Sequence, residues 1–381
     1  MSEQRKATGR HIKKYLDINV VDATKERFDY IYSQFDDVYY MFSGGKDSMV
    51  CIEHGRSYHR EHNLGPVKAI FIDEEILPDC VIDVIKRYKS YDDVCLNWIV
   101  RRIYNSKFCI DETERIVMWG NDSERPNGHV REVPYNDATL IDLNAKPIRQ
   151  QDMDEWVYTS LGMSGKVAFI LGTRADESLV RLASFMHKTR DIYITESSYL
   201  PVKLVKPIYD WNSNDVFKWL FENSIEIGDV YNQDALIGGA MRTATPLHAE
   251  AKRYFQGIAE KDPDYYERIC KAFPDMRAHA SLYKFIDKRA DYVEYIPKGV
   301  QGCIEYARKK YKGNKLIQAL NLVKSFKRLH EKSPDAYPIR QMLMALSNGS
   351  RFSSINPVAK SQQEAEKRIT EKLLKDHGKK V

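Results

Sequence analysis

Short apolar runs alternate with amphipathic stretches through roughly the first 230 residues of the chain. Five of these runs have the length and composition of buried strands: residues 38–42, 67–72, 94–100, 167–171 and 202–205. Between them, apolar residues recur at helical spacing, as in residues 22–35, where Asp22 is the expected N-cap. Strands alternating with helices predict an α/β fold with a doubly wound, mostly parallel, five-stranded sheet.

The pattern predicts a different architecture further along the chain. Residues 101–152 have no clear period and are rich in Asn, Asp, Pro and Gly, so we expect long loops there, of the kind that often cover an enzyme's site. Beyond Tyr231 the pattern is helical and polar, with helices expected at residues 249–272, 278–295, 302–329 and 361–376. We therefore predict an α/β domain over residues 1–234 and a helical, basic domain over residues 235–381.

Composition indicates a soluble globular protein, since 43% of the residues are hydrophobic and 30% are charged. The chain has neither an apolar run long enough to span a membrane nor a signal-peptide core at its N-terminus, so we expect a cytoplasmic protein without a membrane partner. Its six cysteines include no Cys-x-x-Cys pair, and we expect no iron–sulfur cluster. His54, His59 and His62 lack a metal-site spacing and are interpreted as a solvated helix surface.

The net charge of +5 conceals an uneven distribution. Residues 301–381 contain 18 Lys and Arg against 7 Asp and Glu, a net charge of +11, which leaves −6 for residues 1–300. A basic C-terminal region suggests a polyanionic partner, with nucleic acid as the first choice. The alternative is that these lysine-rich helices are only solvated.

Candidate chemistry begins with the hexapeptide SGGKDS at residues 43–48, which follows the first predicted strand and opens a helix. Consecutive glycines let the backbone turn tightly, and the N–H groups at the start of the helix point toward an anion. The segment matches neither the Walker pattern nor the Gly-x-Gly-x-x-Gly of dinucleotide folds. We interpret it as a phosphate-binding loop. Asp73 and the segment 172–174 also follow predicted strands, so the fold should bring all three to one edge of the sheet.

The order of SGGKDS, FIDEE, GTRADESLVR and KPIYDWNSNDVFKWL resembles the phosphoadenosine phosphosulfate (PAPS) reductase-like family of the adenine nucleotide α-hydrolase (PP-loop) superfamily. The likeness runs from about residue 13 to 245 and is closest to a branch named after an immunoglobulin-binding regulator. Members of this branch carry a helical C-terminal extension of unknown function. The resemblance implies binding of ATP or PAPS.

Position by position, the resemblance implies a role for each motif residue. The phosphate or sulfate cradle would consist of Ser43, Gly44, Gly45 and Ser48. Asp73 would face the nucleoside, and Gly172 with Arg174 would line the nucleotide pocket. A surface ion pair of Arg174 with Asp176 or Glu177 is the alternative for that arginine. Arg242 would lie beside the cleft, where it either clamps a phosphate or an acceptor or is a surface arginine.

Two departures from the family bear on the reaction. Sulfonucleotide reductases of this family use a cysteine near the C-terminus, whereas this chain has no cysteine after Cys303. The branch often has a cysteine two residues after the arginine, where this chain has Ala244. Sulfonucleotide reduction or sulfur transfer is therefore disfavoured.

The remaining chemistry is cleavage of ATP between the α and β phosphates, by adenylylation or pyrophosphate release, with a nucleic acid as a candidate substrate for modification. Lys46 and a Mg²⁺ ion would stabilise the leaving pyrophosphate, unless the Lys46 side chain points to solvent. Asp47 either holds the Mg²⁺ or caps the helix. The alternative function is a non-catalytic regulator that senses an adenylate and binds DNA or a protein partner. The acceptor and the choice between ATP and PAPS stay open.

Overall fold

The computed structural model describes most of the chain in two compact units. The described residues are 16–108, 113–177, 181–182, 185, 192–196, 202–229, 245–248, 255–279, 291–348, 355–358 and 360–376. Unit 1 comprises Met1–Ile103 and Arg131–Ala244, and unit 2 comprises Tyr104–Val130 and Thr245–Val381. The expected domain boundary after residue 234 falls outside the described residues and stays a prediction.

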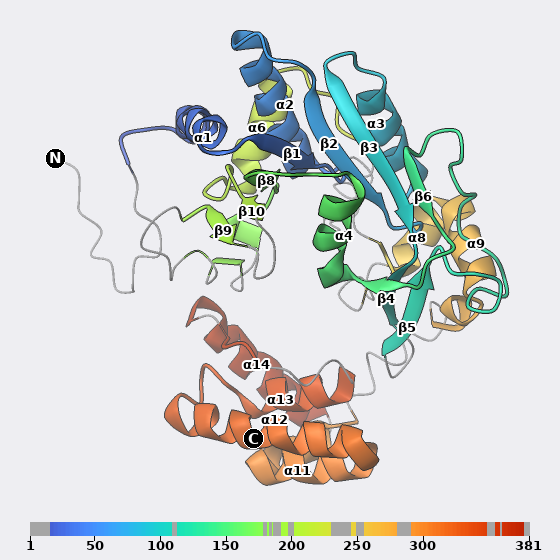
Figure 1. Cartoon of the computed structure of the whole chain (residues 1–381). Coiled ribbons are helices and arrows are strands. Elements are labelled where there is room, and N and C mark those ends of the chain that lie inside the picture. Colours follow the sequence, from blue (N-terminus) through green and yellow to red (C-terminus); the bar gives the residue numbers. More distant parts are fainter. Residues whose placement is uncertain are drawn as a thin grey trace. The chain divides into compact units, whose positions relative to one another are not determined.

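A seven-stranded sheet forms the centre of unit 1 (Figure 1). Its strands are β1 (Asp37–Met41), β2 (Val67–Asp73), β3 (Val94–Arg101), β6 (Leu140–Asp142), β8 (Val167–Ile170), β9 (Ile194–Glu196) and β10 (Val202–Val205). They lie in the order β6-β3-β2-β1-β8-β10-β9, with only β9 antiparallel to its neighbour. The mostly parallel sheet and its five predicted strands are confirmed. β6 and β9 enlarge it to seven, because three-residue strands leave too little pattern to detect.

Strand β1 lies in the middle of the sheet and is covered on both faces. Its Tyr40 is paired with Ala69 of β2 on one side and Ile170 of β8 on the other. A parallel strand buried on both faces is apolar at successive positions instead of at every second one, which explains the run at residues 38–42. The chain leaves β1 for β2 and β3 in one direction and returns to β8 on the other side, so the topological switch lies between β1 and β8.

Helices cover both faces, which confirms the doubly wound arrangement. One face carries α1 (Val20–Gln34), α2 (Lys46–Glu61) and α3 (Asp79–Lys89), and the rings of Phe28 in α1 and Tyr40 in β1 stack at 6.3 Å. The opposite face carries α4 (Met153–Ser160), which follows the short turn η1 (Gln150–Asp152). Met153 and Val157 of α4 share a buried cluster with Tyr39 of β1. Helix α6 (Ser213–Glu222) packs beside α2.

The expected N-cap of the first helix was wrong. Helix α1 begins one turn earlier than predicted, and its cap is Asn19 instead of Asp22. The Asn19 side-chain oxygen accepts hydrogen bonds from the backbone N–H groups of Val21 and Asp22 at 2.9 and 3.0 Å. Asp22 lies in the first turn, where a carboxylate also suits the helix dipole.

Residues 101–152 contain more regular structure than the predicted long loops. Besides β6, they include β4 (Ile103–Phe108), β5 (Thr113–Met118), β7 (Ile148–Arg149) and η1. The backbone N–H of Ile148 donates to the carbonyl of Arg102 at 3.2 Å. These strands were missed because charged residues interrupt their apolar alternation, as in the sequence TERIVM of β5.

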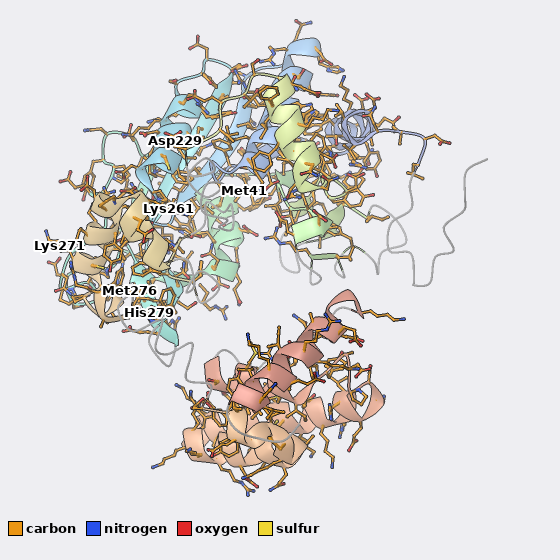
Figure 2. All side chains as sticks on the ribbon, turned by 180° about the vertical axis from the view of Figure 1, so that it is seen from behind. Met41, Asp229, Lys261, Lys271, Met276 and His279 are labelled. Atoms are coloured by element: carbon orange, nitrogen blue, oxygen red, sulfur yellow. The ribbon has the colours of Figure 1, made fainter. Side chains whose placement is uncertain are left out.

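In unit 2, β4 and β5 are neighbouring strands, and the Phe108 ring of β4 lies 5.9 Å from Phe255 and 4.5 Å from His279. Phe255 opens α8 (Phe255–Lys261), which is followed by α9 (Pro263–Ala272). Within the described residues, the predicted helix at 249–272 is two helices. They are separated at Asp262, whose carboxylate caps α9. Figure 2 labels His279 and Met276 just beyond α9.

The rest of unit 2 is a helical bundle with a core of its own. It contains η4 (Val293–Lys298), α11 (Gly299–Lys310), α12 (Gly313–Lys332), α13 (Ile339–Asn348) and α14 (Lys360–Asp376). Cys303, Phe326 and Leu343 are among its buried residues. The predicted helix at 302–329 is two helices, because the chain turns at Gly313, whose φ is +56°. α13 was not predicted, and most of the predicted helix 278–295 lies outside the described residues.

Candidate functional site

The glycine loop connects β1 to α2 through a turn that glycine favours. The loop follows Met41, the last residue of β1, which Figure 2 labels. Gly44 has a φ of +70°, a conformation that costs other residues steric energy. Gly45 is the N-cap of α2 and makes no side-chain capping bond. An anion is therefore a suitable acceptor for the N–H groups of this first turn.

The two serines of the loop are brought together. Ser48 Oγ donates a hydrogen bond to the Gly45 carbonyl at 2.8 Å, and the Ser43 and Ser48 hydroxyl oxygens are 3.3 Å apart. The backbone N–H of Gly45 donates to Ser43 Oγ at 3.4 Å. The four predicted cradle residues thus form one continuous turn at the carboxyl end of the central strand.

Gly172, which follows β8, approaches the same turn closely. A Cβ atom on Gly172 would lie 2.6 Å from the Asp47 carbonyl carbon and 2.8 Å from the Ser48 nitrogen. Only glycine allows such an approach between backbones. The structure therefore brings Gly172 and the glycine loop together, as their positions after neighbouring parallel strands predicted.

Arg174 and Lys46 both pair with Asp47. Arg174 Nε lies 2.6 Å from Asp47 Oδ1, and Lys46 Nζ lies 2.8 Å from Asp47 Oδ2. The side chains of Arg174 and Lys46 are only 3% and 8% exposed, so these pairs are shielded from solvent. Lys46 is therefore buried instead of solvent-directed. The ion pair between Asp47 and Arg174 is a feature that sequence reasoning missed.

The expected alternative partners of Arg174 are more distant. Its guanidinium lies 3.8 Å from Asp176 and 4.0 Å from Glu177. A second hydrogen bond runs from Arg174 to Ser213 Oγ at 3.2 Å. Arg174 is thus a buried arginine held mainly by Asp47, and it links the segments that follow β8 and precede α6.

The segment before α6 is anchored to helix α1. Arg27 of α1 donates to both carboxylate oxygens of Asp210 at 2.8 and 2.6 Å. Trp211 is fully buried, and its indole N–H donates to Thr24 Oγ1 at 2.9 Å. These contacts hold the chain that carries Ser213.

Asp73, which was expected to face the nucleoside, is fully buried at the end of β2. One carboxylate oxygen accepts from the indole N–H of Trp98 at 2.9 Å. The other accepts from the Glu75 backbone N–H at 2.9 Å and from Arg131 at 2.5 Å. Asp73 thus fixes the local fold. Its nucleoside role stays a prediction.

Glu74 differs from both acidic neighbours because its side chain is partly exposed. The Gln150 side-chain amide donates to Glu74 Oε1 at 3.2 Å. Burial raises the pKa of Glu74, and the Gln150 hydrogen bond opposes that shift. Glu75 is buried, and its φ of +63° marks a sharp turn of the backbone. Sequence reasoning gave Glu74 no role.

The site suits Mg²⁺ only as a companion of phosphate groups. Within the described ranges, no three His, Cys, Asp or Glu side chains cluster in a way that would hold a metal ion. Mg²⁺ commonly combines one or two carboxylates with phosphate oxygens and water, so Asp47 alone is compatible with it. Arg242 lies outside the described residues. None of the helices that the structure describes is long and apolar enough to cross a membrane.

Comparison with known proteins shows a match to the phosphoadenosine phosphosulfate reductase domain over residues 37–269, well over half of the chain. The uncharacterized protein YbdN of Escherichia coli (strain K12) is 22% identical over 274 residues, which cover 67% of this chain and 65% of YbdN. The chain thus spans just under two thirds of the length of that relative.

Two solved structures are distantly similar. The FMN adenylyltransferase of Candida glabrata, in complex with FAD and inorganic pyrophosphate, shares 13% identity over 56% of this chain and 59% of its own, with a TM-score of 0.38. The PAPS reductase of Candida auris, a phosphate complex, shares 11% identity over 58% of this chain and 93% of its own, with a TM-score of 0.32. The domain match carries more weight than either likeness.

Proposed function

The chain belongs to the phosphoadenosine phosphosulfate reductase domain family, and we propose that it is an enzyme that binds ATP at residues 43–48 and cleaves it between the α and β phosphates. The observation that carries this proposal is the placement of two buried cations, Lys46 and Arg174, on either side of Asp47 at the turn that opens α2. A glycine turn, a helix N-terminus and a lysine together suit a pyrophosphate group.

In the proposed reaction, an acceptor oxygen or nitrogen attacks the α-phosphorus. The bond from the acceptor to that phosphorus forms as the bond to the α,β-bridging oxygen breaks. Pyrophosphate leaves with the electron pair, and the proton of the acceptor passes to water. Negative charge grows on the leaving group, where the loop N–H groups and Lys46 would stabilise it. Arg174 would position Asp47 and Lys46. Mg²⁺ bound to the nucleotide and Asp47 would neutralise further phosphate charge.

The cysteines favour this reaction over sulfonucleotide reduction. A reductase of this kind needs a reactive thiolate, and Cys303 is the last cysteine in the chain. It is buried inside the helical bundle, and burial raises its pKa to about 12. Such a thiol would be almost entirely protonated at neutral pH and would make a poor nucleophile.

We further propose that helix α12 binds nucleic acid, which would supply the acceptor. Lys324, Arg328 and Lys332 are exposed and recur at a spacing of four residues, so they share one side of the helix. A row of cations on one helix face suits a phosphate backbone. Lys327 borders this face and pairs with Glu331 at 3.7 Å. The exposed Lys315, in the first turn of α12, lies on the opposite side of the helix.

The test of the reaction is pyrophosphate release from Mg·ATP by the full chain, with and without DNA or RNA. We expect Asp47→Ala and Ser43→Ala to abolish release and Ser57→Ala, a change near the other end of α2, to leave it intact. Tight ATP binding without release under every condition would contradict the reaction and support an adenylate-sensing regulator.

The test of the nucleic-acid proposal is the salt dependence of binding, measured by fluorescence anisotropy with labelled DNA and RNA. Replacing both Lys324 and Arg328 by Gln removes two phosphate contacts, which should lower the slope of log affinity against log salt by about 2. Lys315→Gln, on the opposite side of the helix, should change the slope much less. Equal effects of the two variants would contradict a specific role for this face.

A further inference from the structure

Two apolar side chains at the carboxyl end of the sheet are only partly buried. Met41 ends β1, and Ile72 is the second-last residue of the adjacent strand β2. Both pack on the edge of the cluster that α4 forms with Tyr39 and Ile70, which are themselves buried. Side chains in central strands are normally covered, so α4 leaves an apolar area accessible next to the phosphate loop. An adenosine attached to phosphates in that loop would find an apolar surface there.

Glu74 lies at the border of this area. Its hydrogen-bond donor Gln150 belongs to η1, the turn that leads into α4, so Glu74 lies on the side of the sheet that α4 covers, as Ile70 and Ile72 do. Residues Asp73 and Glu75 are both buried, and the Asp73 carboxylate is held by Trp98 and Arg131. Glu74 is the partly exposed carboxylate of the three, and its described hydrogen bond comes from a neutral amide.

Close backbone packing borders the loop on its other side. There, Gly172 lies against the backbone of Asp47, and the buried Arg174 pairs with the Asp47 carboxylate. The close approach of Gly172 leaves little room between the loop and the segment after β8, whereas Met41 and Ile72 offer partly exposed apolar side chains on the side that α4 covers. This apolar area favours Met41, Ile72 and Glu74 as the neighbours of the nucleoside of a loop-bound nucleotide.

We propose that Glu74 determines nucleotide specificity: it selects an adenosine with unmodified ribose hydroxyls, as in ATP, and rejects one with a 3'-phosphate, as in PAPS. The inference rests on the proposed nucleotide site. A carboxylate accepts hydrogen bonds from ribose hydroxyls, whereas a ribose phosphate calls for a cation at the same place, as in the discrimination between NAD and NADP. Two like charges at close range disfavour binding, so Glu74 acts by attraction to one ligand and repulsion of the other.

The test compares adenosine 5'-monophosphate with adenosine 3',5'-bisphosphate, which differ only in the 3'-phosphate. Neither contains the bond that the proposed reaction cleaves, so calorimetric binding to the full chain reports specificity without turnover. We expect the monophosphate to bind at least about tenfold more tightly than the bisphosphate. Glu74→Gln should bring the two affinities together, mainly by strengthening binding of the bisphosphate.

Matched variants separate specificity from folding. Glu61→Gln makes the same charge change at the far end of α2 and should keep the preference. Glu74→Asp, which retains the charge, should keep a preference for the monophosphate. Glu74→Ala, which also removes the charge, should lose it and replaces Glu74→Gln if that variant does not fold.

Each result has a definite meaning. Equal or tighter binding of the bisphosphate by the unaltered chain, or an unchanged preference in Glu74→Gln, overturns the inference. If neither nucleotide binds, both the inference and the nucleotide site fail. A preference that depends on Glu74 without pyrophosphate release from ATP upholds the inference and overturns only the proposed reaction.

Discussion

Arg174 Nε lies 2.6 Å from Asp47 Oδ1, across 127 positions of sequence. The pair joins the segment after β8 to the first turn of α2, which are the two sides of the topological switch in the sheet. Asp47 also contacts Lys46, so one carboxylate compensates two cations at the glycine loop. This shared role predicts that changes at Asp47 and Arg174 will not act independently.

Removing either partner of this pair should be costly. We expect Asp47→Asn and Arg174→Gln each to lower the free energy of unfolding by about 2–4 kcal/mol, because a buried charge loses its partner. The double variant should lose clearly less than the sum of the single losses. Urea unfolding of the four proteins measures this coupling. Additive losses would mean that the two side chains contribute separately.

Gly172→Ala should disturb the glycine loop. The added Cβ would meet the backbone of Asp47 and Ser48 at 2.6–2.8 Å, so β8 and α2 would have to separate. We expect weaker ATP binding and a loss of at least about 1–3 kcal/mol of stability. Gly65→Ala is the control, because its Cβ would meet no atom within 4 Å. Equal ATP affinity for both variants, by calorimetry, would show that the close approach is unimportant.

Two helix-interior glycines should respond to alanine in opposite directions. A Cβ on Gly55 of α2 would lie 2.1 Å from the Tyr40 hydroxyl oxygen, and Tyr40 is buried in β1. Gly55→Ala should therefore destabilise the protein by about 1–3 kcal/mol despite the better helix propensity of alanine. Gly257 of α8 has only the end of Lys261 near that position, at 3.9 Å, so Gly257→Ala should stabilise its helix by up to about 1 kcal/mol. Thermal unfolding of the two variants decides whether the signs differ.

Acid should destabilise the fold through His54. Burial lowers its pKa to about 4, and Lys25 adds to the shift. Between pH 6.5 and 4 the unfolded chain binds a proton that the folded protein does not. The free energy of unfolding therefore decreases as the pH is lowered, and up to about 3 kcal/mol is lost below pH 4. His54→Phe should remove this part of the loss.

The comparison uses urea midpoints at pH 7 and pH 5 for the unaltered chain, His54→Phe and His62→Phe. His62 is exposed at the end of α2, and its replacement should leave the pH dependence as it is. An unchanged pH dependence in His54→Phe would show that other groups dominate the response to acid.

The parallel strands and the glycine loop were predictable because both depend on local pattern. A strand buried on both faces is a continuous apolar run, and the Gly44–Gly45 pair marks a turn at its end. The strands of residues 101–152 were not predictable, since a short strand with charged residues has no distinct period. The hydrogen bond from Gln150 to Glu74, the residue after β2, was not predictable either, because the two residues are 76 positions apart in the sequence.

Burial and pairing of polar side chains also required the structure. The interpretation of His54 as solvated was wrong, because Trp219 of α6 stacks on its ring at 4.4 Å. Arg174 was expected to have sequence neighbours as its alternative partners, yet its shortest ion pair is with Asp47. Both outcomes depend on which elements pack together, and local sequence does not contain that information.

The contacts of α1 imply that the folded unit begins before the first residue of the family match. The match begins at residue 37, which lies after α1. Yet Arg27 of α1 donates a hydrogen bond to Asp210, and Thr24 of α1 accepts one from Trp211. A protein trimmed at residue 37 would keep every motif residue that the structure describes and still lose the support of the segment that carries Ser213. Family boundaries are therefore poor guides for truncating this protein, because α1 supports the segments that surround the glycine loop.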